Sequence, residues 1–365
     1  MIEYILIFVL LFVVTVGLYA LYSKYVDKKS SNESGVYIKA LRDLLDGRIE
    51  SAFSNLRQTV SEDSSNIDAY LRLGQILREH GKPERALQVH KDLTLRDGLA
   101  ATQKATVLRE LFLDYSTLKD TDMAEAALKE LLSYDSGNRW GHMKLLELQK
   151  AESKWEEAYD SAVTILRLES DKSKKPLAVF KYNIGMDLTK KRDYHKARVL
   201  FKEALGLDPK YSEAFIAIGD SYAQEERYED AVNFWEKLIE AVPCDGGRVI
   251  DRLKRSLFDL GRFGDIESIC EKILEQVPAD RKAKLTLAEI HKKKGELDIA
   301  ERLLFDLVEE SPKDVNIVMQ LVRLYLEKNE NEKLDRLFRN IEKQTKSADG
   351  QLTQDNDVKA ASTQG

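Results

Sequence analysis

Residues 209–243 read PKYSEAFIAIGDSYAQEERYEDAVNFWEKLIEAVP, and this stretch decides the fold. Apolar residues recur every three or four positions on both sides of a polar turn at residues 225–230, which is the spacing of two amphipathic helices. Gly219 lies in the first helical segment and Ala231 near the start of the second. Small residues there let two antiparallel helices approach to about 8 Å, and a proline cannot continue the second helix. The stretch therefore predicts a helical hairpin that ends before Pro243.

The same pattern returns along the chain at a nearly constant interval. Four of the six prolines are 34, 35 and 34 residues apart, namely Pro209, Pro243, Pro278 and Pro312. A second column holds alanine in seven of nine units: Ala52, Ala86, Ala124, Ala158, Ala197, Ala231, Ile266, Ala300 and Leu334. Twelve residues earlier lies a third column: Ala40, Gly74, Phe112, Leu146, Gly185, Gly219, Lys254, Ala288 and Val322. A period of 34 residues with small residues twelve apart is typical of tetratricopeptide repeats (TPR). We therefore predict an all-α TPR solenoid of about nine helical hairpins.

Two irregularities modify this repeat pattern. The predicted solenoid covers residues 34–346, and extra residues before the third and fifth units should lengthen the loops at Arg96–Ala101 and Ser170–Pro176. The seventh unit has Lys254 and Ile266 at the two small positions, so we expect looser packing or a kink there.

The first 25 residues predict a transmembrane anchor. No charge occurs from Tyr4 to Tyr22, and these 19 residues make about 28 Å of helix, close to the ~30 Å hydrocarbon core. A cleaved signal peptide is the alternative, but no Lys or Arg precedes the apolar run. The basic residues that follow it favour a cytoplasmic C-terminal side: Lys24, Lys28 and Lys29. We expect a polar linker at residues 26–33 and a disordered tail at residues 347–365.

Composition and the missing motifs exclude several classes of protein. The chain has 57 Lys+Arg against 63 Asp+Glu, a formal net charge of −6, without the basic excess of a nucleic-acid binder. Cys244 and Cys270 lie 26 residues apart and form no CxxC pair, which excludes a four-cysteine zinc site. None of the five histidines belongs to a HExxH motif, and no GxSxG occurs. We therefore expect no enzymatic activity, no cofactor and no metal ion.

Solenoids of this kind bind partners mainly along the first helix of each repeat. Positions one and four after the third column, or three and six before it, should face such a groove. We expect the partner-binding residues to be Arg78, Arg109, Trp140, Tyr182, Met186, Arg248 and Arg255, with Asp220 and Phe258 on the same strip. Trp, Tyr and Arg dominate binding energy when a partner buries them. For any single residue, the alternative is a long side chain that only solvates the surface.

The layout resembles the bacterial lipopolysaccharide assembly protein B family. An apolar N-terminal segment is followed by basic residues and then directly by a first unit at residues 37–47. The second unit reads AYLRLG at residues 69–74 and GKPERALQVH at residues 81–90. That family ends in a rubredoxin-like zinc module with two CxxC pairs. This sequence contains no CxxC, so no zinc-binding residue is carried over.

The resemblance implies a TPR adaptor anchored in the bacterial inner membrane, with its solenoid in the cytoplasm. The partners that it implies are the deacetylase that commits precursor to lipid A and a membrane-anchored AAA protease that degrades this deacetylase. The alternative function is a TPR scaffold for another envelope machine, such as a secretion or pilus-biogenesis apparatus. The two hypotheses share their mechanics and differ in the partners.

Overall fold

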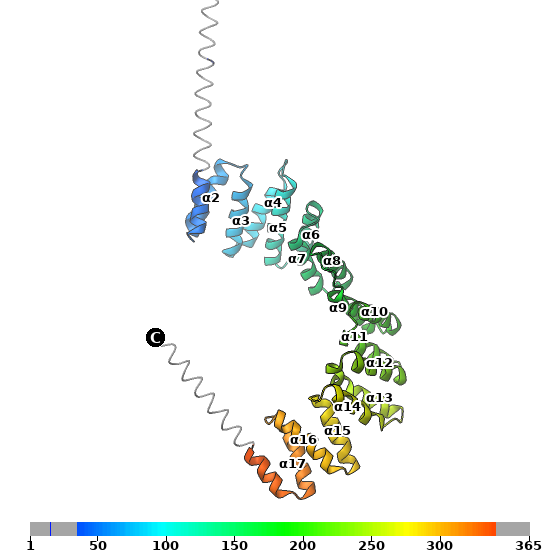
Figure 1. Cartoon of the computed structure of the whole chain (residues 1–365). Helices are drawn as coiled ribbons and strands as arrows, with labels where there is room; N and C mark the ends of the chain where they lie inside the picture. The colour runs from blue at the N-terminus through cyan, green and yellow to red at the C-terminus, as the bar shows by residue number, and fades with distance from the viewer. Residues whose placement is uncertain (1–14, 16–34, 341–365) are drawn as a thin grey trace, which may run out of the picture. The chain divides into compact units, whose positions relative to one another are not determined.

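The computed structural model describes residue 15 and residues 35–340 of the chain. These residues form α-helices and two short 3₁₀ helices and no β-strand, so the all-α prediction is confirmed for them (Figure 1). No helix in this part of the chain is long and apolar enough to cross a bilayer. Apart from residue 15, the predicted anchor at residues 1–25, the linker at 26–33 and the tail at 347–365 lie outside the described residues.

The helices pair into consecutive hairpins within two compact units, residues 1–173 and residues 174–365. The first unit contains residues 35–45 with α2 (Ile49–Glu62), α3 (Ile67–Glu79) with α4 (Pro83–Thr94), α5 (Ala101–Thr117) with α6 (Thr121–Tyr134), and α7 (Arg139–Ala151) with α8 (Trp155–Leu168). The second unit contains η1 (Lys175–Leu177), then α9 (Ala178–Lys190) with α10 (Tyr194–Leu207), α11 (Ser212–Gln224) with α12 (Tyr228–Ala241), η2 (Pro243–Val249) and α13 (Ile250–Asp259) with α14 (Asp265–Gln276), α15 (Arg281–Lys294) with α16 (Leu297–Glu310), and α17 (Val315–Lys328) with residues 331–340.

Short polar side chains and prolines set the ends of these helices. The Asn138 side chain accepts a hydrogen bond from the backbone N–H of Gly141 at 2.9 Å, and the Asp280 side chain accepts one from Ala283 at 2.8 Å. Such bonds satisfy N–H groups that have no partner within the helix. The four regularly spaced prolines each stand two residues beyond the end of a second helix, after α10, α12, α14 and α16. The helix ends that the repeat predicted are thus confirmed.

The two predicted insertions are accommodated differently. The connection from α8 to α9 is long, as expected, and contains η1. The insertion before the third unit goes largely into α5, which has 17 residues where α3 has 13. The expectation of a longer loop there was therefore only partly right. Aligned on Gly74 and Phe112, the extra residues of α5 are residues 101–104, which form an additional N-terminal turn and of which three are exposed.

The core lies between the helices of each hairpin and between neighbouring hairpins. The apolar residues expected around Gly219 and Ala231 are all buried: Phe215, Ile218, Tyr222, Trp235 and Leu238. In the seventh unit Leu253 and Leu257 are also fully buried, and the thiol of Cys270 lies in the same core cluster. The core of the second unit is therefore continuous through this irregular repeat.

Candidate partner-binding groove

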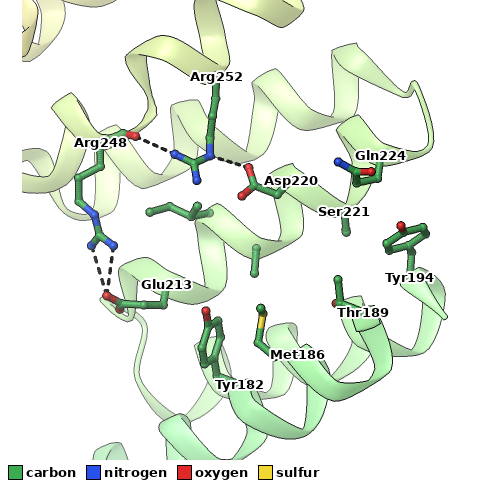
Figure 2. A pocket seen from close by; sticks show the side chains of 12 residues that line it. Tyr182, Met186, Thr189, Tyr194, Glu213, Asp220, Ser221, Gln224, Arg248 and Arg252 are labelled. Carbon is green, nitrogen blue, oxygen red and sulfur yellow. Dashed lines mark hydrogen bonds and ion pairs between the residues drawn. The ribbon is translucent and has the colours of Figure 1, made fainter. Parts of the chain in front are cut away.

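The first helices of three successive hairpins, α9, α11 and α13, line an open groove of about 670 Å³ in the second unit (Figure 2). Its lining residues are Tyr182, Met186, Thr189, Tyr194, Glu213, Ile216, Ala217, Asp220, Ser221, Gln224, Arg248 and Arg252. They come mainly from the helix faces that the repeat register assigned to a partner. Four residues singled out from the sequence lie together here, namely Tyr182, Met186, Asp220 and Arg248.

The groove has an apolar side and a charged side. Tyr182 and Met186 project from α9 on the apolar side (Figure 2). Ile216 and Ala217 of α11 add apolar side chains to the lining. On the charged side, Nε of Arg252 donates a hydrogen bond to Asp220 at 2.7 Å, which links α13 to α11. A surface divided in this way matches an amphipathic segment, because apolar and charged side chains each find a suitable partner.

Two aromatic rings pack against the Tyr182 ring and hold it in place. The ring lies 5.6 Å from the ring of Tyr211 in an edge-to-face arrangement and 5.7 Å from the ring of Phe201. Burial raises the pKa of Tyr182, and the nearby Glu213 carboxylate raises it further. The phenol is therefore neutral at physiological pH, and its position is largely fixed before any partner arrives.

The arginines at the charged side are only partly engaged. Arg248 is exposed and contacts Glu213 and Asp245, each at 3.3 Å, the long end of the hydrogen-bond range. Arg255 lines an adjoining cleft of about 490 Å³, which shares Asp220 and Arg248 with the groove. Its guanidinium donates one hydrogen bond, to the backbone carbonyl of Asp251, and forms no ion pair with the described residues. An incoming carboxylate would find donors free on both arginines.

In the first unit, Arg78 is occupied by the protein's own carboxylates. Its side chain is 12% exposed and pairs with Glu110 at 2.7 Å and with Asp114 at 2.8 Å. The other oxygen of Asp114 contacts Nδ1 of His90 at 2.5 Å, and both of these side chains are fully buried. Arg78 therefore joins α3 to α5 rather than presenting free donors to solvent.

Arg109 and Trp140, two residues expected to bind a partner, contact each other in the first unit. The Arg109 guanidinium lies 4.6 Å from the centre of the Trp140 ring, and this ring packs edge-to-face on Phe112 at 5.4 Å. Arg109 is exposed and Trp140 is half-buried. The pair thus offers a flat, cationic surface, and its role in binding stays a prediction.

Sequence reasoning missed Arg252 and misplaced Phe258. Arg252 lies four residues after Arg248 and three before Arg255, a spacing that puts three arginines on one helical face and that could have revealed it. Phe258 does not line the groove but borders a separate cleft. The structure therefore differs from the prediction for Phe258, although Arg248 and Arg255 of the same unit line the groove and its adjoining cleft as expected.

The groove lining contains no histidine or cysteine, and the described residues hold no cluster of three or more His, Cys, Asp or Glu side chains that could bind a metal ion. The lining offers rings, a thioether and ion pairs. Groups of these kinds suit contact with a protein partner.

Comparison with known proteins agrees with the repeat analysis. The tetratricopeptide repeat family matches residues 188–248 and 257–314. Lipopolysaccharide assembly protein B of Escherichia coli K12 is 23% identical over 281 residues, covering 74% of this chain and 72% of that protein. The protein of the same name from Haemophilus influenzae is 23% identical over 251 residues, covering 69% of this chain and 63% of that protein.

Among solved structures, the TPR2AB-domain:pHSP90-complex of yeast Sti1 matches with a TM-score of 0.40 and 13% identity, covering 75% of this chain and 99% of that one. The described residues form a TPR solenoid, and the resemblance to lipopolysaccharide assembly protein B is confirmed.

Proposed function

Because the chain resembles lipopolysaccharide assembly protein B over about three quarters of its length, we propose that it is a non-catalytic adaptor in lipopolysaccharide assembly. Its groove between α9, α11 and α13 captures a segment of a client protein. The observation that carries this proposal is the division of the groove into an apolar side and a charged side. A catalytic site would require converging nucleophiles, acids and bases, whereas this groove offers surfaces suited to side-chain recognition.

The geometry selects the chemistry of the client segment. A leucine or aromatic side chain would pack over Tyr182 and Met186, where a fixed ring and a flexible thioether accept it at low entropic cost. An acidic side chain on the same segment would reach Arg248 or Arg255, whose donors are underused. Burial of aromatic and arginine side chains by a partner supplies most of the binding energy in such interfaces.

We further propose that residues 1–25 anchor the adaptor in the bacterial inner membrane and that the solenoid lies in the cytoplasm. Tethering raises the effective concentration of a client near a membrane-bound machine without any new contact. The resemblance suggests the lipid A deacetylase as the client and a membrane-anchored AAA protease as the machine. The linker at residues 26–33 is short, so it would keep the first repeat close to the bilayer.

The alternative is a scaffold for a secretion or pilus-biogenesis apparatus. It would use the same groove with different clients. The identity of the captured proteins separates these two functions, and a topology reporter fused to the C-terminus tests the cytoplasmic placement. Reporter activity restricted to the periplasm would rule out the cytoplasmic placement.

The direct test is capture of the lipid A deacetylase by the full-length protein in detergent. Replacing Tyr182 and Met186 by alanine, or Arg248 by glutamate, should weaken binding by about 10-fold or more, the effect expected of central interface residues. Arg85→Glu is the matched control because Arg85 is exposed and lies in the other unit. Unchanged capture by the groove variants would refute the groove, and recovery of secretion or pilus components alone would favour the alternative.

A further inference from the structure

Two phenylalanines of the seventh repeat are unusually exposed. Phe258, at the end of α13, is 66% exposed, and Phe263, in the turn before α14, is 62% exposed. Their rings lie 5.2 Å apart in an edge-to-face arrangement. Two aromatic rings that contact each other and face water form an apolar patch that the fold itself does not cover.

No other unit has an aromatic residue at both of the repeat positions that Phe258 and Phe263 occupy. Phe263 stands three residues before the small position of the second helix, where other units have Trp155, Tyr194, Tyr228 and Leu297. Those four residues are half-buried. Phe258 stands four residues after the small position of the first helix, where the flanking units have Ala223 and Lys292. The repeat fold therefore does not require an exposed aromatic pair here.

The pair forms one wall of a cleft of about 340 Å³ between α13, α14 and α15. Leu257 and Ile266, both buried, and the half-buried Ile290 supply the rest of its apolar lining. The α13 residues that line this cleft differ from the α13 residues that line the groove and its adjoining cleft. The Phe258–Phe263 cleft is thus a separate surface with room for a large apolar side chain.

The rim of this cleft is positively charged. Lys254, Lys293 and Lys294 surround it, together with Glu289. Lys254 pairs with Glu289 at 3.1 Å, and Lys294 pairs with Glu267. Lys293 is exposed and forms no ion pair with the described residues. The uncompensated charge favours an acidic occupant.

We infer that the Phe258–Phe263 cleft is a second docking site, which takes a protein segment with a large apolar side chain flanked by aspartate or glutamate. This inference builds on the proposed adaptor function, because an adaptor must hold two proteins and the groove holds one. The apolar side chain packs in the cleft against the two rings, and the flanking carboxylates pair with Lys293 and its neighbours. The two docking sites share α13 but use different residues of it.

The test uses the full-length protein in detergent and two fluorescein-labelled peptides. The first peptide has a Phe-Leu pair flanked by glutamates, and the second has lysines in place of the glutamates. Fluorescence anisotropy should show binding of the acidic peptide at least about 10-fold tighter than that of the basic one. The double substitution Phe258→Ser with Phe263→Ser should weaken the acidic peptide by about 10-fold, and Lys293→Glu should weaken it by about 3-fold or more.

Phe338→Ser is the matched control, because Phe338 is also exposed and lies outside the cleft. Unchanged melting of the helical circular dichroism signal shows that the variants fold. Tyr182→Ala should leave the acidic peptide bound, so the groove and the cleft can fail independently. Equal binding of both peptides, binding of neither, or loss through Tyr182→Ala alone would overturn the inference. Sedimentation with phosphatidylglycerol vesicles that depends on the two phenylalanines, without peptide binding, would assign the surface to the bilayer instead.

Discussion

The indole of Trp235 occupies the space that a side chain on Gly219 would need: a Cβ on Gly219 would lie 2.3 Å from the indole Nε1. In two other hairpins a glycine has the same relationship to the residue 16 positions later. A Cβ on Gly74 would lie 2.2 Å from Nε2 of His90, and one on Gly185 would lie 2.6 Å from the ring of Phe201. In these hairpins, glycine in the first helix accommodates a ring from the second.

Gly219→Ala should therefore destabilise the second unit. The added methyl group has no room, and overpacking of a core costs about 1–3 kcal/mol. Urea unfolding followed by circular dichroism should show this loss. Gly206→Ala is the control, since a Cβ there meets no atom within 4 Å and Gly206 lies in α10. The control should stabilise the protein by about 0.5–1 kcal/mol because alanine is the better helix former. Equal effects of the two changes would contradict the role of Trp235.

The sequence predicted the hairpins but not this pairing. The columns of small residues marked where the helices cross, and the prolines marked where they end. The ring that fills the space over each glycine could not be assigned, because it depends on how one helix is rotated and offset against the other. The compensation is visible only in the structure: where the third column has the large Leu146, the residue 16 positions later is the small Ala162, and Lys254 is likewise followed by Cys270.

The same limit applies to the groove. The period of a helix predicts which residues share one of its faces, and this period correctly assigned Tyr182 and Met186 to the groove lining. The ion pair between Arg252 and Asp220 joins helices one repeat apart, and this contact depends on the stacking of whole repeats. Phe258 lines a cleft together with residues of α14 and α15, and this contact likewise depends on how the repeats stack.

The turns inside the hairpins provide a second prediction. Each of these turns has one residue with positive φ, which is glycine in four units and another residue in five: Lys119, Ser153, Arg192, Glu226 and Asn329. The φ of Glu226 is 59°, a conformation that costs a residue other than glycine about 1 kcal/mol or more. Glu226→Gly should raise the unfolding free energy by about 0.5–1 kcal/mol after the entropy of the unfolded chain is counted.

The reciprocal change is the control for this turn. Gly261→Ala, at a φ of 71°, should lower the unfolding free energy by a comparable amount, although a Cβ there meets no atom within 4 Å. A destabilising Glu226→Gly would mean that the Glu226 side chain contributes contacts that outweigh the backbone strain.

A third prediction separates Arg78 from Arg109, which the sequence placed in the same role. Arg78→Met leaves the fully buried Asp114 with only His90 as its partner, so the unfolding free energy should fall by about 3–5 kcal/mol. Arg109→Met removes a contact between an exposed guanidinium and Trp140, which should cost about 0.5–1 kcal/mol. Urea denaturation of the two variants measures the difference. Similar losses for both would show that the Asp114 network contributes little to stability.

The two cysteines should differ sharply in reactivity, and this difference offers a probe of the groove. Burial, together with the smaller effect of Asp280, raises the pKa of the Cys270 thiol to about 12, whereas Cys244 is exposed. At pH 7.5 a thiol of pKa 12 is ionised in only about one molecule in ten thousand or fewer, and the thiolate is the reactive form. A maleimide should therefore add once to the native protein and twice in urea, as mass spectrometry would show. Cys244→Ser should abolish the native label.

Because Cys244 lies four residues before Arg248, a fluorophore there should respond when a client segment fills the groove. Two labels on the native protein would mean that the core around Cys270 opens readily, and the seventh repeat would then be the loosest part of the second unit, as its sequence first suggested.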